Sequence, residues 1–462
     1  MRVSVFISFV SLILINLIGS SCANIVPPSG GPRDSLPPKL LKVEPKDSSL
    51  NFRSKTIVFT FDEYVDLQDV SNNLLFTPIF PTNPEVQVKL KTVTVKFRDT
   101  LLPNTTYVLN FGNAIKDINE GNVLRNFKYV FSTGPILDSL TLNGKVIIAE
   151  TGKIDTTLQV ILHKDLSDTA VRKKAPNYAA RLDGSGNFRF TNLPAGDYAI
   201  YALGDAGIIR RYLDTTKLFA FSDSVVRVAP NRSPQITLYA YKQSAAVTST
   251  SSNSKAPSDK KLRIINNLNS NQQDLLSDLE ISFEQPLRFF DSTKIAVSTD
   301  SAYKPLTNYT VVLDSLKKKL RLNTQWNPNT KYHLVFDKDF AEDTLGRRLA
   351  KTDTLSFTTK KLSDYGNITI RVRNVDAKRN PVLQFLQNDA VVFATPISSG
   401  RFTQKLFAPG EYSLRILYDT NSNGKWDPGH FFGVKRQPEL VQNIDRKIVI
   451  KPGAANEFEI SL

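Results

Sequence analysis

The sequence predicts an all-β protein made of tandem β-sandwiches, in which a two-domain unit is duplicated. Short apolar runs with polar residues at every second position recur along the chain, and this period of two is typical of half-buried strands. Similar short sequence motifs recur about 220 residues later in the chain. No long stretch has apolar residues at helical spacing. Together these observations favour repeated strand-rich domains over any helical architecture.

The first 21 residues have the pattern of a secretory signal peptide. A basic start at Arg2 is followed by a mostly apolar run, 3–18, and by small residues directly before Cys22, the only cysteine in the chain. The apolar run is shorter than the ~20 residues of a membrane-spanning helix. A cysteine at this place resembles the lipobox of bacterial lipoproteins, although Gly19 stands where that family usually has leucine. The resemblance implies that Cys22 carries fatty acyl chains such as palmitate. Secretion without a lipid and an uncleaved anchor are the alternatives.

The composition favours several domains on a tether. Residues 22–38 are rich in proline and glycine, which predicts an extended spacer. The chain has 462 residues, more than one core usually serves, and 41% of them are hydrophobic. Since no second cysteine is present, each exported domain must rely on its own apolar core.

Four sandwiches and one linker are predicted after the tether. The domains are expected at 39–134, 139–242, 262–360 and 366–462, and a segment rich in Ser, Thr and Lys, 243–261, is the linker. In the first domain the alternating runs predict strands at 56–61, 86–90, 92–97, 106–111 and 127–132. In the second they predict strands at 142–148, 158–163, 186–190 and 196–202.

The duplication is visible in short phrases. The Pro-Asn-Thr motif and its strand at 103–111 recur at 328–336, and the loop Asp-x-x-x-Gly at 117–121 recurs as Asp-x-x-Gly at 343–346. A Gly-x-Phe step at 186–188 likewise returns further along the chain. This period is too long for a solenoid and indicates a tandem of whole domains.

Two of the predicted domains resemble a known family. The phrases at 58–65, 102–111, 114–121 and 129–133 resemble those of the SbsA-type bacterial Ig-like domain. The match covers the first domain well and 262–360 more loosely. The resemblance implies a structural or binding role and no reaction.

The other two predicted domains, 139–242 and 366–462, look like carboxypeptidase-regulatory or Cna B-type prealbumin-like sandwiches. Their shared mark is Gly-x-Phe followed by a Pro-Gly turn and a tyrosine. The leader and the residues after Cys22 are similar to lipoproteins of the Bacteroidetes type.

One loop in the last predicted domain has metal-ligand spacing. Asp419, Asn421, Asn423 and Asp427, with the carbonyl of Lys425, follow the start of a calcium loop. A histidine replaces the bidentate glutamate expected at the twelfth position, so any calcium affinity is expected to be low. An Asx-rich hairpin loop held by its own hydrogen bonds is the alternative.

No catalytic site is predicted. The three histidines fall in different predicted domains, and the usual nucleophile, zinc and phosphate motifs do not occur. A hydrolase whose residues meet only in the folded chain is one alternative. A glycan-binding accessory protein that uses Trp326, Trp426 and the excess of basic residues is another.

The sequence therefore predicts a lipid-anchored envelope protein that acts as a spacer or binding scaffold. Its expected partners are the membrane, through the lipid, and an envelope protein or glycan. Nucleic acid is not expected, because the charge of +15 lies in short scattered clusters. The expected location is the outer membrane. The periplasmic face is slightly favoured, because no acidic run follows Cys22.

Overall fold

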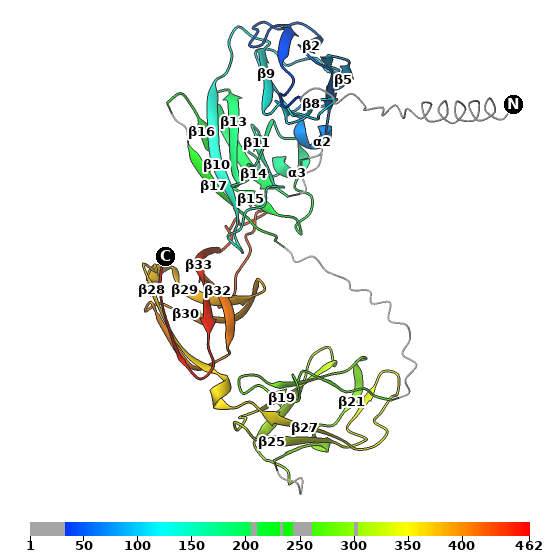
Figure 1. The fold of residues 1–462 in the computed structure, drawn as a ribbon, viewed down its shortest axis with the longest axis vertical. Coiled ribbons are helices and arrows are strands. Elements are labelled where there is room, and N and C mark those ends of the chain that lie inside the picture. The colour runs from blue at the N-terminus through cyan, green and yellow to red at the C-terminus, as the bar shows by residue number, and fades with distance from the viewer. Residues whose placement is uncertain (1–32, 205–209, 232–233, 244–260, 300–303) are drawn as a thin grey trace, which may run out of the picture. The chain divides into compact units, whose positions relative to one another are not determined.

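The computed structural model describes residues 33–204, 210–231, 234–243, 261–299 and 304–462 (Figure 1). The predicted signal peptide, Cys22, most of the predicted tether and nearly all of the predicted linker lie outside these residues.

The prediction of an all-β protein is confirmed. In the described residues the only α-helices are α2 (Val70–Asn73) and α3 (Ala170–Lys173). Three short 3-10 turns lie at Ser292–Lys294, Leu362–Asp364 and Ala377–Arg379. Within the part of the chain that is described, no helix is long and apolar enough to cross a membrane.

The first sandwich contains nine strands. The sheet β1-β2-β6-β5 packs on the sheet β4-β7-β9, and β3 pairs with β8. The strands are β1 (Leu40–Glu44), β2 (Thr56–Phe61), β3 (Val65–Leu67), β4 (Leu75–Thr77), β5 (Glu85–Lys89), β6 (Thr92–Lys96), β7 (Thr106–Gly112), β8 (Ile115–Asp117) and β9 (Phe127–Ser132).

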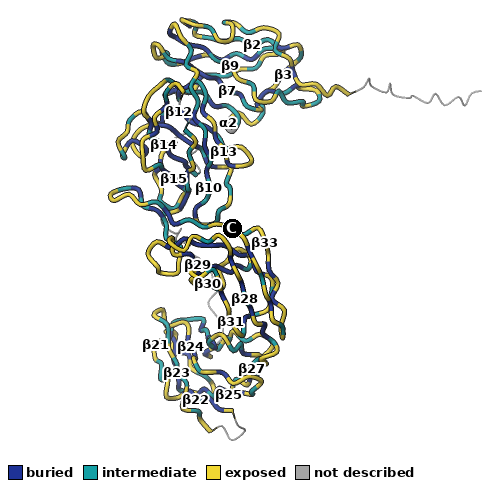
Figure 2. Tube along the Cα trace, turned by 90° about the vertical axis from the view of Figure 1, so that its left-hand side faces the viewer, coloured by how far each residue is buried: buried dark blue, intermediate teal, exposed yellow. Residues whose placement is uncertain are grey.

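The core of the first sandwich follows from the alternation of its strands. In β2, every second side chain from Ile57 to Phe61 is fully buried, and the residues between them are partly exposed (Figure 2). The ring of Phe59 meets Phe111 and Tyr129 of the opposite sheet edge to face, at 5.4 and 5.3 Å. Aromatic contacts between the two sheets therefore hold this domain together without a disulfide.

The second sandwich comprises β10 to β17. Its sheets are β13-β10-β17 and β12-β11-β14-β15, and β16 also pairs with β14. The strands are β10 (Leu140–Ile148), β11 (Gln159–His163), β12 (Tyr178–Arg181), β13 (Asn187–Leu193), β14 (Gly196–Leu203), β15 (Phe219–Phe221), β16 (Val226–Val228) and β17 (Gln235–Ala240).

The third sandwich comprises β18 to β27. Its sheets are β18-β20-β24-β23 and β19-β27-β25-β22, with a separate β21-β26 pair. The strands are β18 (Ile265–Asn266), β19 (Gln272–Gln273), β20 (Leu279–Ser282), β21 (Leu287–Phe290), β22 (Ile295–Ser298), β23 (Tyr309–Leu313), β24 (Lys319–Thr324), β25 (Lys331–Phe336), β26 (Ala341–Asp343) and β27 (Asp353–Thr359).

The fourth sandwich comprises β28 to β34, in the sheets β31-β28-β34 and β30-β29-β32-β33. The strands are β28 (Gly366–Arg373), β29 (Pro381–Gln387), β30 (Ala390–Pro396), β31 (Arg401–Phe407), β32 (Gly410–Tyr418), β33 (Leu440–Ile450) and β34 (Ala455–Ser461).

Strand pairing repeats in the two halves of the chain. The first strand of the second sandwich, β10, pairs in parallel with its last strand, β17, and β28 pairs in parallel with β34 in the fourth. Central strands match as well, since β2 pairs with β6 and β20 pairs with β24, both antiparallel. The same topology therefore underlies both copies of the predicted two-domain unit.

The chain divides into two compact units. The described part of the first runs to Thr141 and includes Asn177–Ala179 and Phe190–Ala195. The second contains the rest of the second sandwich and the whole described part of the third and fourth. Each unit is considered by itself below.

Candidate functional site

A phenylalanine from the fourth sandwich is inserted into the core of the second. Phe431 lies between β32 and β33 and is 1% exposed. Its ring contacts Tyr201, Phe219 and Phe221, with centroids 5.5, 5.1 and 5.0 Å away. A Cβ on the neighbouring Gly429 would lie 2.6 Å from the ring of Tyr241, so the chain can approach this closely only with glycine. We call Phe431 and these rings the aromatic clasp.

Polar contacts surround the aromatic clasp. Lys435 pairs with Asp168 at 2.6 Å, and the amide Nε2 of Gln437 donates to the carbonyl of Phe221 at 3.1 Å. A second contact joins β32 to the loop after β10, where the guanidinium of Arg415 donates to the carbonyl of Glu150 at 2.7 Å. Arg415 is 7% exposed, so this bond is shielded from water. The two sandwiches are therefore joined by buried apolar and hydrogen-bonded contacts.

The predicted calcium loop is closed by hydrogen bonds. The buried carboxylate of Asp419 accepts from the backbone N–H groups of Asn423 and Gly424. The side-chain amides of Asn421 and Asn423 both donate to Oδ2 of Asp427, at 2.6 and 2.7 Å. In this arrangement both amides direct their N–H groups, and not their carbonyl oxygens, toward the carboxylate of Asp427. A cation would need the oxygens at this place. The residues as arranged do not fit a cation, and the calcium site stays a prediction.

Glu439 organises the base of this loop, and the sequence pattern did not single it out. Its carboxylate is 4% exposed and accepts from the backbone N–H and the hydroxyl of Thr420, both at 2.7 Å, and from the backbone N–H of Asp427 at 3.0 Å. Its carbonyl accepts from the indole N–H of Trp426 at 2.7 Å. The loop that leads into the aromatic clasp is thus tied to the start of β33.

The two tryptophans of the alternative glycan-binding hypothesis both make contacts within the chain. Trp326 is 7% exposed and packs edge to face on Tyr332 and Phe357, at 5.0 and 5.6 Å. A buried indole has no open face for a sugar, so in this structure Trp326 is a core residue. Trp426 is half-buried, and its indole N–H is already used by Glu439.

One histidine meets a serine. Nδ1 of His333 lies 2.8 Å from Oγ of Ser356, and the two residues are cross-strand partners in β25 and β27. Ser356 is exposed on the sheet, and neither residue lines either of the pockets described for the chain at 52–133 and 428–436. A pair of this kind is the usual cross-strand contact on a sheet face.

His163 is a buried histidine with a strongly perturbed pKa. It is 1% exposed on β11, and Nε2 makes no hydrogen bond within the described residues. Burial disfavours the charged ring and lowers the pKa of His163 to about 4. The ring of Tyr201 covers it edge to face at 5.8 Å. His163 therefore stays neutral in the folded chain at pH values where a free histidine is charged.

This burial predicts acid sensitivity of the second sandwich. Below a pH of about 6.5 the unfolded chain gains a proton that the folded chain does not, so stability falls as the pH falls toward 4. The expected loss is about 3 kcal/mol, at 1.4 kcal/mol for each unit of pKa. Urea unfolding of the whole chain and of H163F, from pH 8 to pH 4, measures it. At pH 8 the histidine is neutral in both states and the two proteins differ only in packing. An H163F variant with the parent's pH dependence would contradict the prediction.

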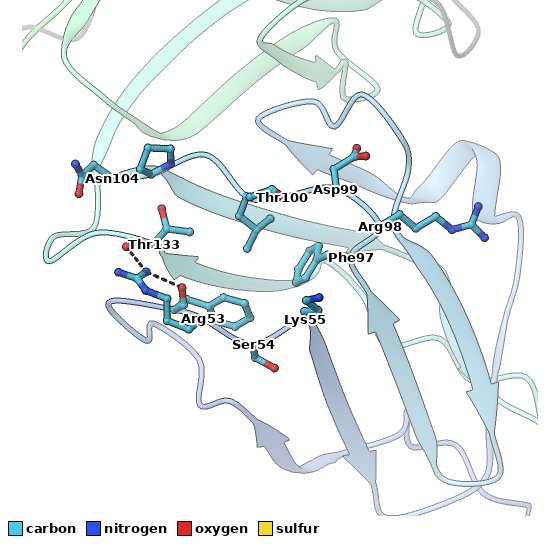
Figure 3. Close-up of a pocket in the computed structure, with 12 residues that line it drawn as sticks. Arg53, Ser54, Lys55, Phe97, Arg98, Asp99, Thr100, Asn104 and Thr133 are labelled. Atoms are coloured by element: carbon cyan, nitrogen blue, oxygen red, sulfur yellow. Dashed lines mark hydrogen bonds between the residues drawn. The ribbon is translucent and has the colours of Figure 1, made fainter.

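A pocket of about 430 Å³ lies at one end of the first sandwich (Figure 3). Its lining residues come from the segment before β2, from the β6–β7 loop and from the residue directly after β9. They are Phe52, Arg53, Ser54, Lys55, Phe97, Arg98, Asp99, Thr100, Leu101, Pro103, Asn104 and Thr133. Phe52 and Phe97 are only 4% and 6% exposed and form the apolar floor.

The cationic groups of this pocket differ in how they are held. Nη1 of Arg53 donates to the carbonyls of Phe52 and Thr133, at 2.9 and 2.8 Å. Among the described residues, Arg53 and Lys55 have no acidic partner. Arg98, by contrast, pairs with Glu85 at 3.3 Å.

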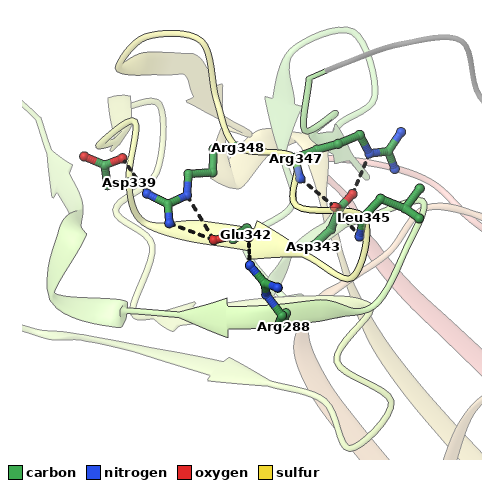
Figure 4. A network of polar contacts seen from close by, with 7 residues as sticks. All are labelled: Arg288, Asp339, Glu342, Asp343, Leu345, Arg347 and Arg348. Carbon is green, nitrogen blue, oxygen red and sulfur yellow. Dashed lines mark hydrogen bonds and ion pairs between the residues drawn. The ribbon is translucent and has the colours of Figure 1, made fainter.

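A charged network stabilises the third sandwich (Figure 4). Glu342 is 7% exposed and accepts from Arg288 and Arg348, while Nε of Arg347 pairs with Oδ2 of the fully buried Asp343 at 2.6 Å. Burial alone would raise the pKa of Asp343, but the donors of Arg347 and Leu345 outweigh it and lower that pKa. These charges satisfy one another and point to a structural role.

The matching loop of the first sandwich is also held by a buried aspartate. Asp117 is 1% exposed, and its carboxylate accepts from the backbone N–H groups of Glu120, Gly121 and Asn122, at 2.6, 2.9 and 2.7 Å. Burial opposes ionisation, but these donors lower the pKa of Asp117. The motif that recurs in the sequence is therefore a buried carboxylate that caps a loop.

Comparison with known families agrees with the first and third sandwiches. The model of the bacterial Ig-like domain matches residues 34–133 and 264–359. The chain contains two bacterial Ig-like domains. The resemblance noted in their sequence is thereby confirmed at the level of this family. The prealbumin-like resemblance of the second and fourth sandwiches stays a prediction.

Three solved structures match the chain at low identity and low TM-score. The TIE protein of Bacillus anthracis is 12% identical over 94% of this chain and 76% of its own, with a TM-score of 0.18. The S-layer protein rSbsC(31-844) is 11% identical over 90% and 67%, with a TM-score of 0.16. BcpA, the major pilin subunit of Bacillus cereus, is 10% identical over 71% and 99%, with a TM-score of 0.17. No curated protein matches the chain in sequence.

Proposed function

We propose that this protein is a non-enzymatic, lipid-anchored protein of the bacterial cell envelope that acts as a structural spacer and binding scaffold. The observation that carries the proposal is the aromatic clasp. Phe431 joins the fourth sandwich to the second, although the Ig-like third sandwich stands between them in the sequence. Such a contact holds two domains that are not adjacent in the sequence in a defined relation, which is what a spacer requires.

The apolar cores of the domains and the contacts of their polar side chains support the same role. The first, third and fourth sandwiches each have a separate apolar cluster of fifteen or more buried residues. Buried carboxylates whose pKa is lowered, such as those of Asp117 and Asp343, are used to hold loops. The His333–Ser356 pair lies across a sheet ladder. Structure, rather than turnover, accounts for these side chains.

The proposed lipid anchor rests on the N-terminal sequence, which has the pattern of a signal peptide followed by Cys22. An acylated Cys22 followed by the proline-rich segment 22–38 would hold the first Ig-like domain at a distance from the membrane. The chain has no other cysteine, so the modification can be assigned to this thiol by mass alone.

Replacing Cys22 by serine tests the anchor. In the native host, the parent is expected in the detergent phase after phase separation, with the mass of an acylated chain that begins at Cys22. C22S is expected in the aqueous phase, since it cannot be acylated. The matched control is C22S/S35C, which restores one thiol at an exposed position away from the cleavage site and should also stay aqueous. Equal partition of the parent and C22S would overturn the proposal.

A further inference from the structure

The first and third sandwiches can be compared position by position, because their central strands pair in the same register. Ile57 lies opposite Val95 in the β2–β6 pair, and Leu279 lies opposite Leu322 in the β20–β24 pair. Both pairs contain fully buried residues of their sandwich cores. The ends of the two domains can therefore be matched residue by residue from these positions.

The matched ends carry different residues. Four residues after Val95 stands Asp99, and four after Leu322 stands Trp326. The indole of Trp326 turns inward and donates to the carbonyl of Ser277 at 3.1 Å, which closes this corner of the third sandwich. The counterpart of Ser277, two residues before the central strand residue, is Lys55, which lines the pocket of the first.

In the first sandwich other rings pack at this corner, since Phe52 and Phe97 lie 4.0 and 5.7 Å from Phe131, and a pocket remains outside them. The carboxylate of Asp99 points away from Phe97 and accepts from the backbone N–H of Thr82 at 2.7 Å (Figure 3). The loop from Phe97 to Pro103 is also two residues longer than the matching loop from Thr324 to Pro328. The result is the pocket of about 430 Å³ with an apolar floor. A space of this size is sufficient for one aromatic side chain.

The cationic side chains in the wall of the pocket favour a negatively charged ligand. Arg53 uses only Nη1 in its bonds to backbone carbonyls, so Nε and Nη2 make no hydrogen bond within the described residues. Lys55 is exposed and has no acidic partner among them. The one carboxylate in the lining, Asp99, is turned to Thr82. An incoming carboxylate would therefore meet two cations above the apolar floor.

We propose that the pocket between the approach to β2 and the β6–β7 loop binds an aromatic side chain flanked by acidic residues, presented by a partner protein. The aromatic ring packs on the floor formed by Phe52 and Phe97. Arg53 and Lys55 bind the flanking carboxylates. This proposal rests on the scaffold role and names the partner chemistry of one Ig-like domain.

A protein segment fits this pocket better than a glycan does. Sugars stack on exposed ring faces, whereas the rings of Phe52 and Phe97 are 4% and 6% exposed and form a floor below the pocket mouth. An inserted ring that contacts such a floor buries apolar area on all sides.

The test measures peptide binding to the whole chain purified in detergent. The probe is a fluorescein-labelled peptide, Gly-Ser-Asp-Trp-Glu-Gly-Ser, followed by anisotropy. Matched peptides with Asp-Ala-Glu or Lys-Trp-Lys at the centre remove the ring or reverse the charge, and both are expected to bind at least about tenfold more weakly. The assay needs no membrane, so a failure of the anchor proposal would leave its result unchanged.

Three variants locate the site. K55E reverses the charge of an exposed side chain and is expected to weaken binding about tenfold. D99W places an indole at the register of Trp326 and is expected to abolish binding. K128E, an exposed charge reversal outside the pocket, should bind as the parent does.

Two results would overturn the proposal. One is Asp-Trp-Glu binding that neither K55E nor D99W reduces, because the peptide would then bind elsewhere. The other is a pocket that takes an anionic polysaccharide such as polygalacturonate and not the peptide, with K55E reducing that binding. K55E keeps the test valid if D99W does not fold.

Discussion

Replacing Phe431 by alanine is expected to destabilise the second sandwich and release the fourth from it. The ring is 1% exposed and contacts three aromatic residues of the second sandwich, so its loss leaves a cavity in their midst. Truncation of a buried phenylalanine costs about 3–5 kcal/mol. Denaturant unfolding measures the loss, and hydrogen exchange should show faster exchange in β15, whose strand lies directly below the ring.

The matched control lies three residues away on the same loop. Val434 is 87% exposed, so V434A removes apolar atoms that pack on little. It is expected to change the stability by less than about 0.5 kcal/mol. If F431A unfolds at the same denaturant concentration as V434A, and β15 keeps its protection, the aromatic clasp does not join the two sandwiches in solution.

Replacing Asp343 by alanine is expected to destabilise the third sandwich by a similar amount. Asp343 is fully buried and Arg347 is 7% exposed, so the variant leaves a buried guanidinium without its closest partner. Breaking a buried ion pair from one side costs about 3–5 kcal/mol. The backbone N–H groups of Leu345 and Arg347 also lose their acceptor. Unfolding of the parent, D343A, R347A and the double variant measures the coupling of the pair.

Two comparisons sharpen this prediction. D117A in the first sandwich removes an equally buried carboxylate that bonds to backbone N–H groups, so a smaller loss of about 1–3 kcal/mol is expected. The pKa of Asp343 is lowered on folding, so its contribution is present above a pH of about 4 and is lost as the pH falls through the folded value. A D343A variant as stable as the parent at pH 7 would contradict this account of the network.

The strands of the Ig-like domains could be predicted from sequence because their burial alternates. The strands expected at 56–61 and 127–132 are β2 and β9 with the same bounds, and 92–97 differs from β6 by one residue. In a half-buried strand every second side chain faces the core, so the alternation can be recognised within a few consecutive residues. The parallel pairing of β10 with β17, and of β28 with β34, depends on contacts far apart in the sequence and was not predicted.

The candidate site was predicted less well, since its residues act through contacts between domains. Phe431 and Phe432 follow Pro428 and Gly429 in a polar loop, and an apolar pair in such a place signals a buried contact. The signal does not say which domain receives the ring. Likewise, the positions of Trp326 and Trp426 near loops left both sugar binding and packing open, and the structure shows that Trp326 packs inward on Tyr332.

The sequence by itself determined the all-β class, the duplication and the two Ig-like domains, because each depends on periodicity or on short phrases that survive in a single chain. Only the tertiary structure decided that Phe431 belongs to the core of the second sandwich and that Glu439 holds the Asp-rich loop. It also decided that Asp99 turns to Thr82 at the position where Trp326 turns inward in the matched domain. These outcomes depend on contacts between side chains that are tens to hundreds of residues apart in the sequence, and a local sequence pattern does not predict such contacts.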